Sequence, residues 1–208
     1  MRRGILGAVL ATAGLVLLAG CADGSSTSAA SSAPKDLIKY LPNEKQLSDA
    51  GAKQKQAPAS FAVGWINPLH VVPPCEGKRP WDSALRSNVQ ATAVAGELSV
   101  WQLAAEYEGY SGEQLLSTVD KALNCGDAAA HDRELGAPPR FSVLGVADPQ
   151  LGFCRRFREA GLSSCAWVFA HGDRVLAIRT DSTTTGAAEQ QTELKRLAPA
   201  FVAVFDQD

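Results

Sequence analysis

The sequence predicts an α+β domain in which a mostly antiparallel sheet carries helices packed on one of its faces. Residues 99–108 alternate apolar and polar side chains, the period of a sheet strand with one buried face. Residues 111–125 and the stretch after Thr185 place apolar side chains at helical spacing. Four short apolar runs lie between these two segments, and such grouping of strands and helices favours antiparallel pairing.

The chain opens with the three parts of a lipoprotein export signal. A positive start at residues 1–3 precedes an apolar run over 5–18 and small residues before Cys21. The apolar run is too short for a comfortable spanning helix. We expect residues 1–20 to be a signal peptide and Cys21 to become the lipidated N-terminus on the outer face of the cell membrane. Two or three acyl chains such as palmitate would anchor it stably, whereas a single chain is marginal.

Two alternatives remain open for this N-terminal segment. A plain signal peptide or a short N-terminal anchor would leave Cys21 unmodified. The paired arginines at positions 2 and 3 are compatible with twin-arginine export as well as with ordinary secretion.

A polar tether follows the export signal. Residues 22–34 consist of Ser, Ala, Gly and Thr with one Asp and one Pro, which cannot bury enough apolar surface to fold. We therefore expect a flexible tether over 21–35 and one domain over 36–208, a size that can bury its own core. Without residues 1–20 the chain carries 18 basic and 22 acidic side chains, a net charge of −4. This balance argues against nucleic acid as a partner.

The first half of the domain reads as a short helix followed by strands and loops. Pro42 fits the first turn of a helix that carries Leu47 and ends near Gly51. We then expect a polar connection at 53–58, a strand at 61–66 and a proline-flanked loop at 67–74. A helical turn at 82–86 and strands at 89–95 and 99–108 follow. The last strand divides its apolar and polar residues between two faces: Trp101, Leu103, Ala105 and Tyr107 on one, Gln102, Glu106 and Glu108 on the other.

The second half begins with a helix and continues as a meander. Ser111 and Gln114 form a capping-box pair, and Gly126 ends the helix just after Cys125. Strands are expected at 141–146, 153–158, 165–171 and 174–180, with a two-residue turn at 172–173. A final helix after residues 183–185 has a kink or restart at Pro199. Its predicted core face comprises Leu194, Leu197, Ala198, Phe201, Val202 and Phe205.

Four cysteines remain after Cys21, an even number that favours two disulfides in an exported protein. Three connectivities are possible. Cys154 and Cys165 fall on adjacent strands of a hairpin turning near residues 160–161, so we favour this pair. Cys75 would then bond Cys125 and fasten a loop to the end of a helix. No close Cys-x-x-Cys pair occurs, and we expect neither a metal site nor a cofactor.

The order of these features resembles a known family. The chain has a cysteine after a proline-rich loop, an aromatic strand, a helix ending Leu-Asn-Cys at 123–125 and a strand beginning Phe-Cys-Arg-Arg at 153–156. In this order they resemble the extracellular sensor domain of mycobacterial Ser/Thr kinases. This PknH-like class also occurs in stand-alone lipoproteins, and the resemblance covers roughly residues 36–205. It implies an α+β sandwich with a cleft, disulfides paired first with second and third with fourth, and a ligand-sensing role. The spacing of Cys154 and Cys165 is tighter than in that class.

The sequence offers little catalytic chemistry. It contains no Gly-x-Ser-x-Gly elbow, no His-Glu-x-x-His and no phosphate-binding glycine loop. His70, His131 and His171 are isolated from one another in the sequence. A Ser/His/Asp set could still assemble in space, because triads are defined by geometry. We nevertheless expect a domain that is not an enzyme.

Arginines and tryptophans are the candidate binding residues. The last strands carry Arg155, Arg156, Arg158, Arg174 and Arg179. Of these, Arg156 and Arg158 are predicted to bind an anion or glycan, the alternative being a solvated sheet face paired with acidic neighbours. Trp65, Trp81, Trp101 and Trp167 could line a sugar or lipid cleft, but the positions of Trp101 and Trp167 favour packing in the core.

Together these observations favour a membrane-anchored lipoprotein with a non-catalytic ligand-binding or sensor domain. Its partners would be the membrane, through the lipid anchor, and a small-molecule, lipid or glycan ligand. The arginine-rich strand and the loop over 67–75 are the first places to look for a binding surface. A structural or protein-interaction lipoprotein of the envelope is the second class, and it would show an exposed apolar patch in place of a cleft. A secreted hydrolase is the third.

Overall fold

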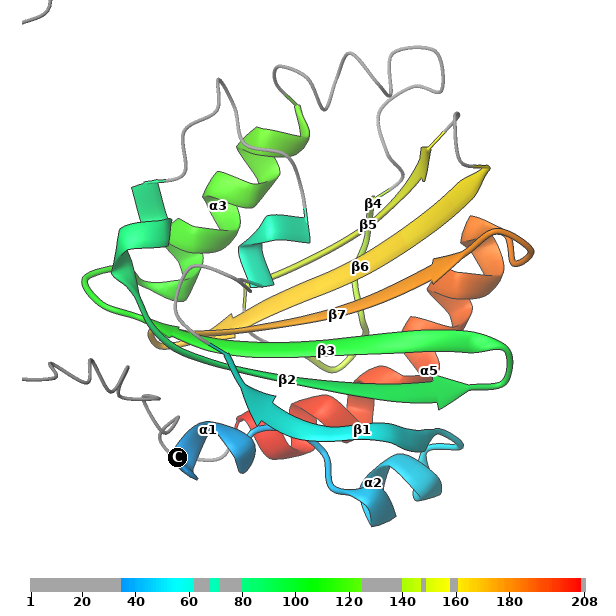
Figure 1. The fold of residues 1–208 in the computed structure, drawn as a ribbon. Coiled ribbons are helices and arrows are strands. Elements are labelled where there is room, and N and C mark those ends of the chain that lie inside the picture. Colours follow the sequence, from blue (N-terminus) through cyan, green and yellow to red (C-terminus); the bar gives the residue numbers. More distant parts are fainter. Residues whose placement is uncertain are drawn as a thin grey trace, which may run out of the picture. The chain divides into compact units, whose positions relative to one another are not determined.

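The computed structural model describes residues 35–61, 68–71, 80–124, 140–146, 149–157 and 161–206. These residues form a seven-stranded sheet in the order β1-β2-β3-β7-β6-β5-β4, with every neighbouring pair antiparallel (Figure 1). The strands are β1 (Lys53–Ser60), β2 (Leu85–Ala95), β3 (Leu98–Tyr107), β4 (Arg140–Phe141), β5 (Gln150–Phe157), β6 (Leu162–His171) and β7 (Arg174–Ser182). The helices are α1 (Lys35–Ile38), α2 (Glu44–Asp49), α3 (Gly112–Leu123) and α5 (Ala187–Phe205), with short 3-10 turns η1 (Pro68–Val71) and η3 (Pro80–Ala84). The predicted α+β class and antiparallel sheet are confirmed.

Helices cover both faces of the sheet, so the prediction of helices on one face is wrong. Trp167 and Phe169 of β6 pack in the core that also contains α5, whereas Ala166 and Val168 pack in the core that contains α3. Figure 1 shows α3 and α5 on opposite sides of the strands. The middle of β6 is an unbroken apolar run, which is typical of a strand buried on both faces.

The same arrangement corrects the expected half-buried strand at 99–108. Val100 and Ala104 are fully buried on the α5 side of β3, and Ala105 and Tyr107 are fully buried on the α3 side. Gln102, expected on a solvated face, is fully buried. Alternate side chains of β3 therefore face two different apolar cores. They do not divide between a core and the solvent.

Strand β1 replaces the polar connection expected at 53–58. It is an edge strand with irregular register against β2, and all of its residues are at least partly exposed. Lysines, bulges and a proline are tolerated on such an edge, and they hinder pairing with other chains. Phe61 lies beyond the end of β1, and residues 62–66 of the expected strand lie outside the described residues.

The helix predicted near Pro42 begins later than expected. Asn43 is the N-cap of α2, and its side chain accepts from the backbone N–H of Gln46 at 3.0 Å. Helix α3 is confirmed with its Ser111–Gln114 capping box and its buried apolar face. Cys125 and Gly126 lie beyond the described part of this helix.

The meander is confirmed in outline. Gly172, with φ of 61°, occupies the two-residue turn between β6 and β7. Helix α5 runs unbroken through Pro199, so no restart occurs there. The strand expected at 141–146 stops at Phe141, because the side chain of Gln150 bonds the backbone that follows: it accepts from the N–H of Val143 at 2.8 Å and donates to the carbonyl oxygen of Val143 at 3.0 Å.

Gln102 places a polar amide in the core on the α5 side. Its cross-strand neighbours are Ala91 and Ile178, and both polar atoms of its side chain lack a hydrogen-bond partner among the described residues. We predict that Gln102→Met, which keeps the length of the side chain, raises the free energy of unfolding by about 1 kcal/mol because it removes an unsatisfied buried amide. Urea unfolding of the two proteins measures the change.

Gln54→Met on the edge strand is the matched control, because Gln54 is partly exposed. We expect the control to change the free energy of unfolding by less than about 0.5 kcal/mol. A clear loss of stability in Gln102→Met would contradict the assignment of Gln102 as an unsatisfied group.

Candidate functional site

The chain enters the described domain at the end of the molecule where α5 terminates. The ring of Tyr40, just after α1, contacts the ring of Phe205 with centroids 6.0 Å apart. The guanidinium of Arg174 lies 4.1 Å from the centroid of the Tyr40 ring. A helix of 19 residues is about 28 Å long, so α5 begins about 28 Å from this contact. Two hollows lie toward that distant end of α5.

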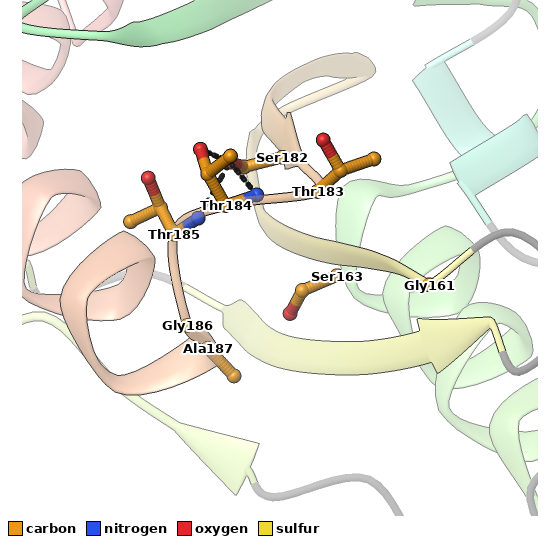
Figure 2. Close-up of a pocket in the computed structure, with 8 residues that line it drawn as sticks. All are labelled: Gly161, Ser163, Ser182, Thr183, Thr184, Thr185, Gly186 and Ala187. Atoms are coloured by element: carbon orange, nitrogen blue, oxygen red, sulfur yellow. Dashed lines mark hydrogen bonds between the residues drawn. The ribbon is translucent and has the colours of Figure 1, made fainter.

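The first hollow is a pocket at the start of α5 with a volume of about 320 Å³. We call it the hydroxyl pocket, and Figure 2 shows its lining residues: Gly161, Ser163, Ser182, Thr183, Thr184, Thr185, Gly186 and Ala187. Ser163 and Ser182 are cross-strand partners at the paired ends of β6 and β7. The lining is thus almost entirely hydroxyl groups and backbone.

Local hydrogen bonds fix the turn that forms one wall of the hydroxyl pocket. The hydroxyl oxygen of Ser182 accepts from the backbone N–H of Thr184 at 3.1 Å and of Thr185 at 2.8 Å. The Ser182 and Thr184 hydroxyl oxygens also lie 3.3 Å apart, within hydrogen-bond range. Serine side chains commonly hold turns in this way.

Gln190 ties this turn to the sheet. Its side chain is fully buried, and its amide nitrogen donates to the carbonyl oxygens of Ser163 at 3.1 Å and Thr185 at 2.9 Å. Its amide oxygen accepts from the Thr180 hydroxyl at 2.9 Å. All the bonding groups of one glutamine are therefore used to hold β6, β7 and the first turns of α5 together.

A disulfide lies beside the same helix turn. The predicted Cys154–Cys165 bond is confirmed, and it joins facing residues of β5 and β6. The carbonyl oxygen of Ala187 lies 3.4 Å from the sulfur of Cys165 and 3.7 Å from that of Cys154. Cys75 and Cys125 lie outside the described residues, so their pairing stays a prediction.

The second hollow is a groove of about 360 Å³ on the α3 side of the sheet, lined by Lys55, Gln56, Thr92, Ser99 and Trp101. We call it the Trp101 groove. Trp101 is partly exposed and belongs to neither apolar core, so the prediction that it packs in the core is wrong. Trp167, by contrast, is fully buried as predicted.

Polar side chains surround the Trp101 indole. The guanidinium of Arg179 lies 5.9 Å from the ring centroid and forms an ion pair with Asp181 at 2.9 Å. On the other side, the Thr92 hydroxyl donates to the amide oxygen of Gln56 at 3.4 Å. The groove thus combines one aromatic face with charged, amide and hydroxyl groups.

Three of the five arginines in the predicted patch are dispersed in the structure, and the prediction for Arg156 and Arg158 stays a prediction. Arg174 packs on Tyr40 and Arg179 beside Trp101, on opposite faces of β7. Arg155 is buried in β5. Arg156 lies in β5 in register with Ser163, whereas Arg158 lies outside the described residues.

The histidines are dispersed. His70 lies in η1, which adjoins β7 and β3, and His131 lies outside the described residues. His171 is 3.8 Å from the carboxylate of Asp206. Within the described ranges no three His, Cys, Asp or Glu side chains gather as a metal site, and no helix is both long and apolar enough to cross a membrane.

Sequence reasoning missed the hydroxyl pocket. Its signal was the run Ser182-Thr183-Thr184-Thr185-Gly186 directly before a long helix, because hydroxyl residues and glycine favour helix N-termini. The Trp101 groove was anticipated only as one option, since the sequence did not show that β1 lies beside β2 and supplies Lys55 and Gln56.

Comparison with known proteins finds similar chains among solved structures alone. No family model and no curated protein matches the chain. Among solved structures, the extracellular domain of PknH from Mycobacterium tuberculosis is similar with a TM-score of 0.45 and 11% identity, over 79% of this chain and 94% of that one. The Rv0999 ortholog from Mycobacterium smegmatis is similar with a TM-score of 0.41 and 12% identity, over 82% of this chain and 98% of that one. The extracellular domain of PknH, to which the sequence resemblance pointed, is thus among the similar solved structures.

Gln190 should be essential for the stability of the hydroxyl pocket. Gln190→Leu leaves the carbonyl oxygens of Ser163 and Thr185 and the hydroxyl of Thr180 without this partner. We predict a loss of about 2–3 kcal/mol in the free energy of unfolding, measured by urea denaturation. Gln191→Leu is the control, because this partly exposed neighbour should change it by less than about 0.5 kcal/mol. Equal effects of the two substitutions would contradict the role given to Gln190.

Proposed function

We propose that this chain is an exported lipoprotein, anchored to the outer face of the membrane through Cys21, whose folded domain binds a ligand without catalysing a reaction. The anchor is supported by the sequence around Cys21 and by the polar tether that follows it. The binding role is supported by one observation above all, the partly exposed indole of Trp101 in a groove with polar walls.

The lining of the Trp101 groove favours a saccharide as the ligand. A large aromatic side chain on a sheet is normally buried in a core, and Trp101 is outside both cores. An indole face packs against the apolar face of a sugar ring, while Gln56, Thr92 and Ser99 offer amide and hydroxyl partners for the sugar hydroxyls. A lipid would call for an apolar lining, which these three residues do not provide.

The anchor is tested by metabolic labelling with a fatty acid. We expect label in the wild-type protein and none in Cys21→Ser, and we expect only the wild type to stay with the membrane fraction. Cys21→Ser keeps the size of the side chain and removes the thiol that is acylated. Equal labelling of the two proteins would reject the lipoprotein assignment.

Binding is tested by mass spectrometry of molecules that co-purify with the full-length protein, followed by titration with cell-envelope oligosaccharides. We expect Trp101→Ala to lower saccharide affinity at least tenfold, because it removes the aromatic face of the groove. The control is Lys45→Ala, an exposed substitution on α2. Saccharide binding that is equal in Trp101→Ala and wild type would reject this site, and the absence of any saccharide binding would reject the proposed ligand class.

A further inference from the structure

We propose that the hydroxyl pocket at the start of α5 is a separate binding site for an oxyanion, specifically a phosphate group. It lies on the other face of the sheet from the Trp101 groove. Asp181 and Ser182 are consecutive residues of β7, so their side chains point to opposite faces. Asp181 pairs with Arg179 beside Trp101, whereas Ser182 lines the hydroxyl pocket.

The start of α5 supplies backbone donors to the pocket. Its N-cap is Gly186, which has no side chain to offer to the first-turn amides of the helix. These N–H groups begin at Ala187, which lines the pocket. They lie at the positive end of a 19-residue helix, where an anion is favoured.

Ser163 of β6, which does not belong to the helix, places a hydroxyl in the same pocket. Ser163 is 9% exposed, and Figure 2 shows its side chain directed toward Gly186 and Ala187. Its carbonyl oxygen is bonded to Gln190, but its hydroxyl bonds none of the described residues. The Ser163 hydroxyl faces the pocket, so it can donate its proton to an oxyanion bound there.

The pocket is also rigid before any ligand arrives. Gln190 bonds both Ser163 and Thr185, and the Cys154–Cys165 disulfide adjoins the carbonyl of Ala187. Donors that are already fixed in place lose little entropy on binding.

A carboxylate close to the pocket allows the phosphate affinity to be changed by a single substitution. The carboxylate of Glu189 accepts from the N–H of Gly186 at 3.4 Å, and its negative charge opposes an incoming anion. Removing the charge of Glu189 should therefore strengthen phosphate binding.

The experiment is a titration of ¹⁵N-labelled full-length protein with inorganic phosphate and, separately, with glycerol phosphate, at constant ionic strength. We expect saturable shifts of the amides at the start of α5. Glu189→Gln should tighten binding about threefold or more, and Ser163→Ala should weaken it about fivefold. Tighter binding of glycerol phosphate than of phosphate would identify an ester as the ligand, and the reverse order would identify the free ion.

Matched controls come from α3. Glu113→Gln also removes a carboxylate from the first turn of a helix, and Thr118→Val removes a helix hydroxyl elsewhere. Neither should change phosphate affinity, whereas Thr183→Val in the pocket wall should lower it even if Ser163→Ala fails to fold. No saturable shift at α5 with either ligand, or the same affinity in Glu189→Gln and wild type, overturns the proposal.

The outcome is distinguishable from that of the saccharide proposal. Saccharide binding is read at the indole N–H of Trp101, and phosphate binding at the amides that begin α5. Either signal can appear without the other, so failure of one proposal leaves the other standing.

Discussion

The pairing of β3 with β7 is the constraint on which the rest of the structure depends. Eight residue pairs, from Ser99↔Asp181 to Glu106↔Arg174, join two strands whose paired residues lie 68 to 82 positions apart in the chain. This pairing connects the β1-β2-β3 meander to the strands that precede α5. It also places Ser99, in the Trp101 groove, opposite Asp181, whose neighbour Ser182 lines the hydroxyl pocket. Both hollows therefore require one long-range contact that local propensity does not supply.

Local patterns were predicted well because their causes are local. The capping box of Ser111 and Gln114 and the Gly172 turn each depend on a few consecutive residues. The Cys154–Cys165 pair followed from a hairpin whose strands are adjacent in sequence. Strand β1 was missed because an edge strand can be polar, and its assignment depends on pairing with residues of β2 that lie 29 to 41 positions later. The face covered by each helix was missed for the same reason, although the apolar run in β6 indicated burial on both sides.

The candidate site was predicted only in part, because side chains meet there from distant elements. The sequence drew attention to Arg156 and to the tryptophans, but not to Ser163, which is the register partner of Arg156. Nor does it show that Gln190 reaches back to β6 across 27 positions. A run of serine and threonine before a helix is common as a cap. It becomes a candidate site only when the sheet brings a second strand with a buried hydroxyl against it.

The position of the chain entry bears on how these hollows meet their ligands. Tyr40 packs on Phe205 at the end of α5, and the hydroxyl pocket lies at its start, so a rigid helix of about 28 Å separates them. The composition of residues 22–34 favours a flexible spacer, and a flexible chain of 13 residues has a root-mean-square length of about 20 Å, comparable with the helix. If Cys21 carries the anchor, the anchor is joined to the domain at α1, and the hydroxyl pocket lies at the other end of α5. On the proposal of a flexible spacer, the anchor would leave the orientation of the domain unconstrained, and the selectivity of each hollow would rest on the chemistry of its lining.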